Sequence, residues 1–139
     1  MSDELYQQKI ISHARDNSHR GRLEDADATA TVDNPMCGDR VTIDLEISNG
    51  TIGRIRHHTR GCLLCNASAA LLSKHARGQT ATDVTAAILA LKAILKGNNN
   101  APGEPWQDLA VFEPVADHKS RHACVLLPFQ AVAEAIGDN

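Results

Sequence analysis

Three cysteines in separate parts of the chain have the chemistry of a metal or sulfur site. Cys37 is followed two residues later by Asp39, Cys62 follows an Arg-Gly pair, and Cys124 stands three residues after Arg121. A thiolate is both a soft metal ligand and a nucleophile toward sulfur, and a carboxylate adds a harder oxygen ligand. These residues therefore predict one site for zinc, for an iron–sulfur cluster or for sulfur transfer.

The spacing of the cysteines excludes the common small zinc modules. The three thiols are 25 and 62 residues apart, whereas zinc ribbons use close pairs. Cys65 forms a CxxC pair with Cys62, but a lone pair is a weak signal, and a small buried residue is the favoured interpretation. His122 is the histidine nearest a site cysteine and is an open candidate for a ligand or proton relay, although a position facing solvent or a carbonyl is favoured.

Length and composition narrow the class of protein. The 139 residues, with 42% hydrophobic and 22% charged residues, predict one globular domain over 1–139. A net charge of −3 argues against non-specific nucleic-acid binding, and no run approaches the roughly 20 apolar residues that span a membrane. The acidic N-terminus lacks the plan of a secretory signal, so we expect a cytoplasmic protein with reduced thiols.

The hydrophobic pattern predicts a helix and then a hairpin in the first half of the chain. Apolar residues at helical spacing over 5–11 predict an N-terminal helix, and small and β-branched residues over 28–32 predict an edge-like strand that ends before Cys37. Strict alternation over 41–47, followed by Asn-Gly at 49–50, predicts a strand and a tight turn into a returning strand over 52–59. Cys37 should therefore lie in a loop.

The second half of the chain reads as helices. A helix over 63–77 places Cys62 at its N-terminus, where exposed amides should favour the thiolate. A capping-box pattern from Thr80 to Asp83 opens the next helix, which ends at Gly97. A short turn over 106–111 leads to a final helix with Cys124 near its N-terminus, since Pro128 fits only near a helix start or a kink.

One face of the returning strand is basic, although the protein is acidic. Arg54, Arg56, His58 and Arg60 alternate with a face that contains His57. A solvated sheet face is the favoured interpretation, because runs of charge are usually solvated. A docking surface for an acidic partner is the second interpretation.

Taken together, these motifs resemble a known family. An N-terminal helix with Leu5-Tyr6, the Asn-Pro-x-Cys-Gly-Asp segment ending at Asp39, Gly61-Cys62 before an Ala/Ser-rich helix, and a third cysteine opening the last helix are similar to the U-type (NifU N-terminal, IscU-like) iron–sulfur assembly proteins. The resemblance covers nearly the whole chain. It implies an α+β fold, a three-stranded antiparallel sheet with helices on one side.

Within that family the chain looks most like the SufU-like branch. The long stretch between Cys62 and Cys124, filled by residues 97–112, and the Arg-x-x-Cys arrangement at Arg121 are similar to that branch. The Leu-Pro-Pro-Val-Lys segment of IscU-like proteins, which recruits a dedicated chaperone, is missing before Cys124. The resemblance therefore implies no such chaperone.

The resemblance also implies a ligand set and a mechanism. Cys37, Asp39, Cys62 and Cys124 would bind one tetrahedral zinc, and Cys37 would accept sulfur from the persulfide of a pyridoxal-phosphate-dependent, SufS-like cysteine desulfurase. The hypothesis is that a partner ligand replaces Cys37 on zinc and frees its thiolate to attack. Arg121 would attract or pair with Asp39 or with the developing thiolate.

Two other function classes use the same residues. Thiolates and a carboxylate also hold a [2Fe–2S] cluster, so the same four residues allow a scaffold that builds and transfers a cluster to downstream assembly or carrier proteins. A purely structural zinc domain is the third class. Asp39 argues against it, because structural zinc sites prefer cysteine and histidine.

Overall fold

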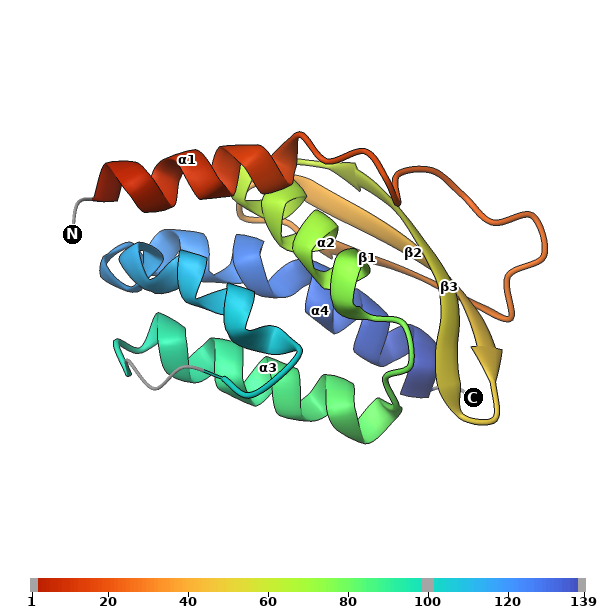
Figure 1. Cartoon of the computed structure of the whole chain (residues 1–139). Coiled ribbons are helices and arrows are strands. Elements are labelled where there is room, and N and C mark those ends of the chain that lie inside the picture. The colour runs from red at the N-terminus through yellow and green to blue at the C-terminus, as the bar shows by residue number, and fades with distance from the viewer. Residues whose placement is uncertain (1–2, 99–101, 138–139) are drawn as a thin grey trace.

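The computed structural model describes residues 3–98 and 102–137 (Figure 1). In chain order the elements are α1 (Asp3–Ala14), β1 (Ala28–Asn34), β2 (Asp39–Ser48), β3 (Thr51–Arg60), α2 (Leu63–His75), α3 (Ala81–Leu95), the 3₁₀ segments η1 (Trp106–Asp117) and η2 (Lys119–Arg121), and α4 (His122–Gly137).

The three strands form an antiparallel sheet in the order β1-β2-β3. The predicted hairpin turn is confirmed: Asn49 and Gly50 adopt φ values of 54° and 79° between β2 and β3, the left-handed backbone that a two-residue turn requires. β1 is an edge strand, as its short pattern predicted, and it delivers the chain directly into the segment that contains Cys37.

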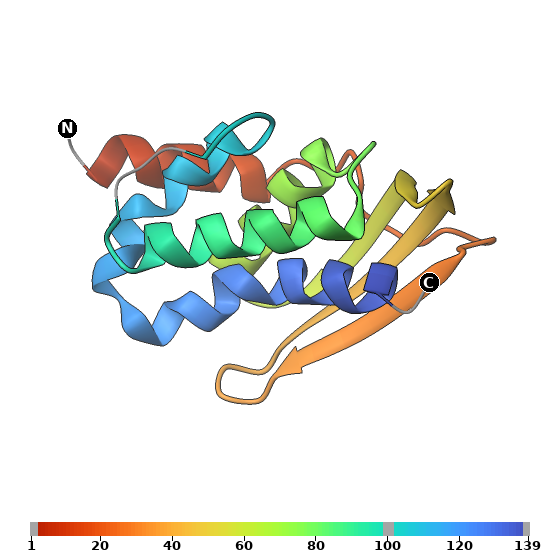
Figure 2. The same ribbon diagram turned by 90° about the horizontal axis from the view of Figure 1, so that it is seen from below.

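The helices cover one face of the sheet, which confirms the predicted α+β fold (Figure 1). α2 and α4 pack against the strands, α1 packs on α2, and α3 runs antiparallel beside α4 (Figure 2). Val41, Ile43 and Leu45 of β2 are fully buried as predicted, but Thr42 and Asp44 between them are buried as well. Phe129 of α4 and Phe112 of η1 supply large side chains to the same core. The connections from β1 to β2 and from β3 to α2, which contain Cys37 and Cys62, lie at the same end of this sheet.

The segment between α1 and β1 crosses the other face of the sheet (Figure 1). It is held by Asp44 of β2, whose carboxylate accepts hydrogen bonds from Arg22 Nε (2.6 Å), the Leu23 amide (3.0 Å) and Thr29 Oγ1 (2.6 Å). The backbone of His57 also exchanges hydrogen bonds with this segment. A buried carboxylate on the outward face of β2 is therefore explained by a strap of residues that covers it.

Several element boundaries differ from the sequence prediction; β1, for example, extends to Asn34, and β2 already begins at Asp39. The region after residue 105 is a 12-residue 3₁₀ segment, η1, instead of a short turn over 106–111. α2 ends at His75, two residues before the predicted end, and Gly78 at φ 85° follows it. Among the residues that the structure describes, no helix is long and apolar enough to cross a membrane.

Candidate metal and sulfur site

The loop that carries Cys37 is organised by Asn34, the last residue of β1. The Asn34 carbonyl accepts hydrogen bonds from the amides of Cys37 (3.3 Å) and Gly38 (2.8 Å), and its side-chain oxygen accepts one from the Met36 amide (3.1 Å). Gly38 has φ 75°, which favours glycine and turns the chain back into β2. The result is a short, bonded loop that leaves the Cys37 side chain exposed.

Asp39 opens β2 and is only 2% exposed. Its Oδ1 accepts a hydrogen bond from the Cys62 amide (3.0 Å), and its Oδ2 accepts one from the Cys62 thiol (3.4 Å). Asn34 pairs with Asp39 across the strands, so the carboxylate is fixed by the sheet on one side and by the start of α2 on the other. The site's oxygen donor is therefore its most constrained member.

Cys62 is the N-cap of α2, as its position before an Ala/Ser-rich helix predicted. Its sulfur accepts a hydrogen bond from the Cys65 amide at 3.4 Å. Cys65 itself is fully buried in the core, in agreement with the favoured sequence interpretation. Of the two cysteines in the CxxC pair, Cys62 therefore caps α2, and Cys65 packs in the core.

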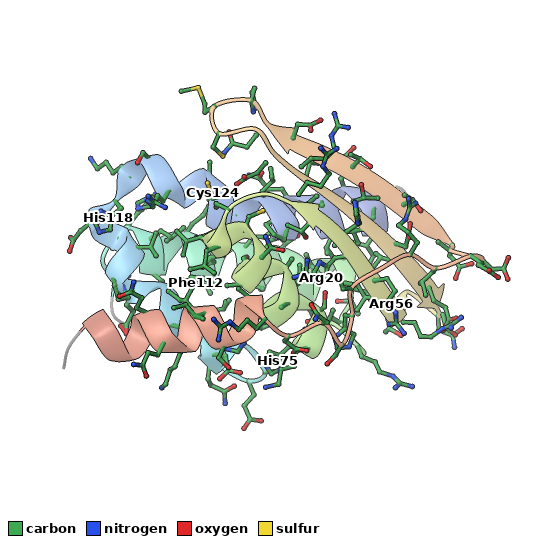
Figure 3. The ribbon with its side chains drawn as sticks, turned by 90° about the horizontal axis from the view of Figure 1, so that it is seen from above. Arg20, Arg56, His75, Phe112, His118 and Cys124 are labelled. Atoms are coloured by element: carbon green, nitrogen blue, oxygen red, sulfur yellow. The ribbon has the colours of Figure 1, made fainter. Side chains whose placement is uncertain are left out.

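Cys124, in the first turn of α4, completes the cluster (Figure 3). Its sulfur lies 3.3 Å from that of Cys37, although 87 residues separate the two in the chain. One donor atom each from Cys37, Asp39 and Cys124 lie within 4.8 Å of one another. Cys62 adjoins this trio through its contact with Asp39 but is not part of that closest set. All four predicted donors are therefore neighbours, from three separate connections of the fold.

The donor geometry is compatible with a tetrahedral metal. Zn–S bonds of about 2.3 Å and Zn–O bonds of about 2.1 Å place two sulfurs about 3.8 Å apart and a sulfur and an oxygen about 3.5 Å apart. The 3.3 Å separation of Cys37 and Cys124 and the 3.4 Å separation of Cys62 and Asp39 are close to these values. Both pairs of donors would have to separate slightly to hold an ion between them.

The carboxylate is the charged member of the cluster when no metal is bound. Burial opposes the charge of Asp39, yet hydrogen bonds from the thiols of Cys37 and Cys124 and from the Cys62 amide hold its pKa below the usual value. Burial also raises the pKa of Cys124, and its hydrogen bonds to Cys37 and Asp39 act in the same direction. A bound cation would oppose this rise in the pKa of the thiol, because a positive charge stabilises thiolates.

The prediction that Cys62 is easily ionised is wrong for the metal-free chain. Burial raises the pKa of its thiol, and the neighbouring Asp39 charge raises it further. The hydrogen bond from the Cys65 amide works in the predicted direction but is outweighed. Cys62 does lie at a helix N-terminus, but burial and the Asp39 carboxylate have the larger effect on the pKa of its thiol.

Among the residues that the structure describes, neither Arg121 nor His122 forms an ion pair with the Asp39 carboxylate. Arg121 is exposed and lines a groove with Leu63 and His118. The Nε2 nitrogen of His122 donates a hydrogen bond that is shared between the carbonyl oxygens of Val115 (3.0 Å) and Ala116 (3.2 Å). This hydrogen bond joins η1 to α4.

Two other arginines border the thiols. Arg40 and Arg60 face each other across β2 and β3 and line the cavity that contains Cys37, Asp39 and Cys62. Arg40 also pairs with Asp33 at 2.6 Å. The sequence signal was adjacency, since Arg40 follows Asp39 directly and Arg60 stands two residues before Cys62. Positive charge at the mouth of the cavity therefore comes from the sheet.

The fold and the cluster agree with a comparison against known families. The family described as NifU-like N terminal domain matches residues 5–125. The chain belongs to this family of U-type iron–sulfur cluster assembly proteins, and its role lies in iron–sulfur cluster assembly.

Relatives with two different names are similar to the chain. The iron–sulfur cluster assembly scaffold protein IscU of Thermotoga maritima is 24% identical over 132 residues, 95% of this chain and 92% of the relative. The zinc-dependent sulfurtransferase SufU of Bacillus subtilis is 21% identical over 134 residues, 96% of this chain and 90% of the relative. Both branches of the family are thus represented at similar identity.

Solved structures match over almost the whole chain. The N-terminal NifU-like protein of Brucella abortus has a TM-score of 0.90 and 37% identity, covering 97% of this chain and 94% of that one. The putative scaffold protein for the SUF system of Fervidobacterium islandicum has a TM-score of 0.86 at 20% identity, covering 98% and 99%. The latter supports the fold.

Proposed function

We propose that the chain, as one U-type domain, is a zinc-dependent acceptor of persulfide sulfur from a cysteine desulfurase. The observation that carries the proposal is the unequal exposure of the thiols. Cys37 is exposed on its loop, Cys62 is half-buried, and Cys124 is 4% exposed. Cys37 is the most exposed of the three, so it is the thiol that a partner would reach first.

The chemistry at Cys37 is a thiol–persulfide exchange. The Cys37 thiolate attacks the outer sulfur of the desulfurase persulfide, a new S–S bond forms, and the bond to the desulfurase cysteine breaks. The desulfurase cysteine leaves as a thiolate, and Cys37 carries the transferred sulfur as a persulfide. No external oxidant or reductant is needed, because the sulfane sulfur only changes its partner.

Asp39, Cys62 and Cys124 would hold the zinc together with Cys37. Zinc, when bound, supplies the positive charge that allows three thiolates and a carboxylate to be deprotonated side by side. Asp39 opens β2, Cys62 caps α2 and Cys124 lies in the first turn of α4, whereas Cys37 lies in the loop between β1 and β2. This difference supports an anchoring role for the first three residues and the transfer role for Cys37.

Exposed apolar side chains flank the thiols and support docking of a protein partner. Met36, next to Cys37, is 92% exposed, and Leu63, next to Cys62, is 47% exposed. Exposed large apolar residues beside a reactive group favour a protein contact. Arg60, which lines the same cavity and makes no ion pair with any residue that the structure describes, would attract the anionic persulfide.

A sulfur-transfer assay with a SufS-like desulfurase tests the proposal. The ³⁵S label from cysteine should appear on the wild-type chain and be absent from Cys37→Ser, while Cys65→Ala should retain it because Cys65 is buried away from solvent. Labelling of Cys37→Ser at the wild-type level would refute the assignment of the acceptor thiol.

The alternative is a scaffold for a [2Fe–2S] cluster on the same four residues. The scaffold name of the Thermotoga relative and the shared donor set favour it equally. Metal analysis of the purified chain and absorption spectra after anaerobic reconstitution separate the two functions. One zinc per chain with stimulated desulfurase turnover supports the acceptor, and a stable visible cluster competent for transfer supports the scaffold.

A further inference from the structure

The sulfur atoms of Cys37 and Cys124 are in contact, 3.3 Å apart. A disulfide bond is about 2.0 Å long, so the two atoms need to approach by only about 1.2 Å to form one. Groups held about 3–3.5 Å apart in one molecule react far faster than the same groups free in solution. The proposed function uses Cys37 as the acceptor, but it gives the Cys124 thiol no reaction of its own.

The two thiols differ in their access to solvent. Cys37 is exposed on the loop between β1 and β2, whereas Cys124 is 4% exposed in the first turn of α4, next to this loop (Figure 3). A sulfur atom that a partner delivers to Cys37 therefore arrives from the solvent side, and the Cys124 sulfur contacts Cys37 from the buried side. A nucleophile and a leaving group on opposite sides of one sulfur atom is the arrangement that thiol–disulfide exchange uses.

We propose that, in the metal-free chain, Cys124 attacks the inner sulfur of a Cys37 persulfide, so that a disulfide joins Cys37 to Cys124 and the transferred sulfur leaves as hydrogen sulfide. The persulfide itself rests on the proposed function. The bond between the Cys37 sulfur and the outer sulfur breaks, and a bond between the two cysteine sulfurs forms. Each cysteine sulfur loses one electron and the outer sulfur gains two, so no other oxidant or reductant takes part.

Attack on the outer sulfur is the competing reaction, and it would only move the persulfide from Cys37 to Cys124. Two features favour the inner sulfur. The Cys124 sulfur already contacts the Cys37 sulfur, whereas the outer sulfur extends from an exposed side chain. Hydrosulfide is also less basic than a cysteine thiolate, and the less basic group leaves faster.

Asp39 provides the path for the proton that Cys124 must lose. Its carboxylate is 2% exposed and accepts hydrogen bonds from the thiols of both Cys37 and Cys124. The Cys124 thiol gives its proton to Asp39 as its sulfur attacks, as general base catalysis requires. The carboxyl group then returns the proton to water, and the departing hydrosulfide takes one up. The products are one disulfide and one hydrogen sulfide, with Asp39 in its starting state.

Metal binding and sulfide release exclude each other in this scheme. Cys124 cannot attack while its sulfur serves as a zinc ligand, so a persulfide on the zinc-loaded chain stays available for transfer. The metal-free chain consumes its own persulfide and ends as a disulfide that contains two of the four predicted donors. The contact between Cys37 and Cys124 thus gives the chain a second reaction, reduction of the sulfur that it carries.

Ellman's reagent tests the closure without any persulfide. One equivalent should modify Cys37 of the metal-free chain and release one thionitrobenzoate, and attack by Cys124 should release a second. We expect two per reagent molecule from the wild type and from Cys65→Ala, and one from Cys124→Ser. A single release by the wild type, or two from Cys124→Ser, overturns the proposal.

Peptide mapping by mass spectrometry identifies the bond that forms in the wild-type chain. The disulfide should join Cys37 to Cys124, and a disulfide that joins Cys37 to Cys62 overturns the proposal. This measurement needs no variant, so it decides the matter even where Cys124→Ser folds poorly.

Sulfide release is tested with glutathione persulfide, a small donor that replaces the desulfurase. After rapid removal of the donor without oxygen, the wild type should release its sulfur as sulfide while the disulfide forms. Cys124→Ser should release sulfide at least about tenfold more slowly, because it lacks the adjacent thiol. A stable persulfide on wild-type Cys37, or one found on Cys124, overturns the proposal. If a desulfurase fails to label Cys37 while the chemically loaded chain still releases sulfide, the acceptor function is refuted and this reaction is supported.

Discussion

Gly61 lies directly against the carboxylate of Asp39. A methyl group built on Gly61 would stand 2.5 Å from Asp39 Oδ1 and 2.7 Å from its Cγ. The carboxylate cannot yield easily, because the Cys62 amide and thiol both hold it. The glycine before Cys62 therefore provides the space that Asp39 occupies.

Gly61→Ala should displace Asp39 and weaken metal binding. We expect at least about a tenfold loss of zinc affinity, since supporting residues at metal sites typically contribute 10–100-fold. Competition with a chromogenic chelator measures it. Gly103→Ala is the control, because a methyl group there meets nothing within 4 Å. Equal affinities of the two variants would contradict the steric argument.

The four thiols of the metal-free chain should react in the order of their exposure. Cys37 is exposed, Cys62 is half-buried, and Cys124 and Cys65 are buried. Burial also raises the pKa of the last three thiols, which lowers their thiolate fractions. Timed alkylation with iodoacetamide followed by mass spectrometry should show Cys37 modified first and Cys65 last. Faster modification of Cys124 than of Cys37 would refute the exposed-acceptor assignment.

Asp44→Asn should destabilise the strap over the sheet. The substitution weakens the bonds from Arg22 and Leu23, and we expect a loss of about 1–3 kcal/mol in urea unfolding at pH 7. These partners lower the pKa of Asp44 against its burial, so the stabilisation holds above its unfolded pKa and is lost as the pH falls through the lower folded value.

Asp33→Asn is the matched control for the strap. Asp33 also pairs with an arginine at 2.6 Å, but both side chains are more than half exposed. A surface pair of this kind contributes at most about 1 kcal/mol. Equal losses for the two variants would mean that the burial of Asp44 is irrelevant.

His57 should make the protein acid-sensitive. Burial, and then the Arg20 charge, lower the pKa of His57 to about 4, so the unfolded chain binds a proton that the folded chain refuses. Stability should therefore fall as the pH drops below about 6.5, by about 2 kcal/mol between pH 7.5 and 5. Urea unfolding at the two pH values of the wild type and of His57→Gln measures this contribution.

The neighbouring histidine is the control for that experiment. His58 is exposed on the opposite face of β3, so His58→Gln should retain the wild-type loss of stability in acid. His57→Gln should lose most of it, whatever its stability at pH 7.5. An unchanged pH dependence in His57→Gln would show that other groups are responsible.

Local signals predicted the parts of the fold that are determined locally. Asn49-Gly50 encodes its own turn, and the capping box of Thr80 and Asp83 forms with both hydrogen bonds in place. The strap could not be predicted, because its anchor joins Arg22 to Asp44 across 22 residues and leaves no periodic pattern. The length of η1 was missed for a similar reason, since η1 packs mainly against α3 and α1, and contacts of this kind leave no local pattern in the sequence.

In the candidate site, too, some features could be predicted from the sequence and others could not. The resemblance named the four donors, and the structure places them together. The roles of Gly61, Arg40 and Arg60 depend on how β2 and β3 pair, and the ionisation of Cys62 depends on the nearby Asp39 charge. Spacing along the chain contains none of this information, because each effect arises between residues brought together by folding.

The contact between Cys37 and Cys124 also determines when the four residues can come together during synthesis. Cys37, Asp39 and Cys62 leave the ribosome early, and Cys124 follows Cys62 by another 62 residues. Until α4 docks on the sheet, a nascent chain can offer three donors at most. With the proposed set of four ligands, complete loading of this site therefore requires α4 to be in place, so a fully coordinated metal would report that the chain has folded.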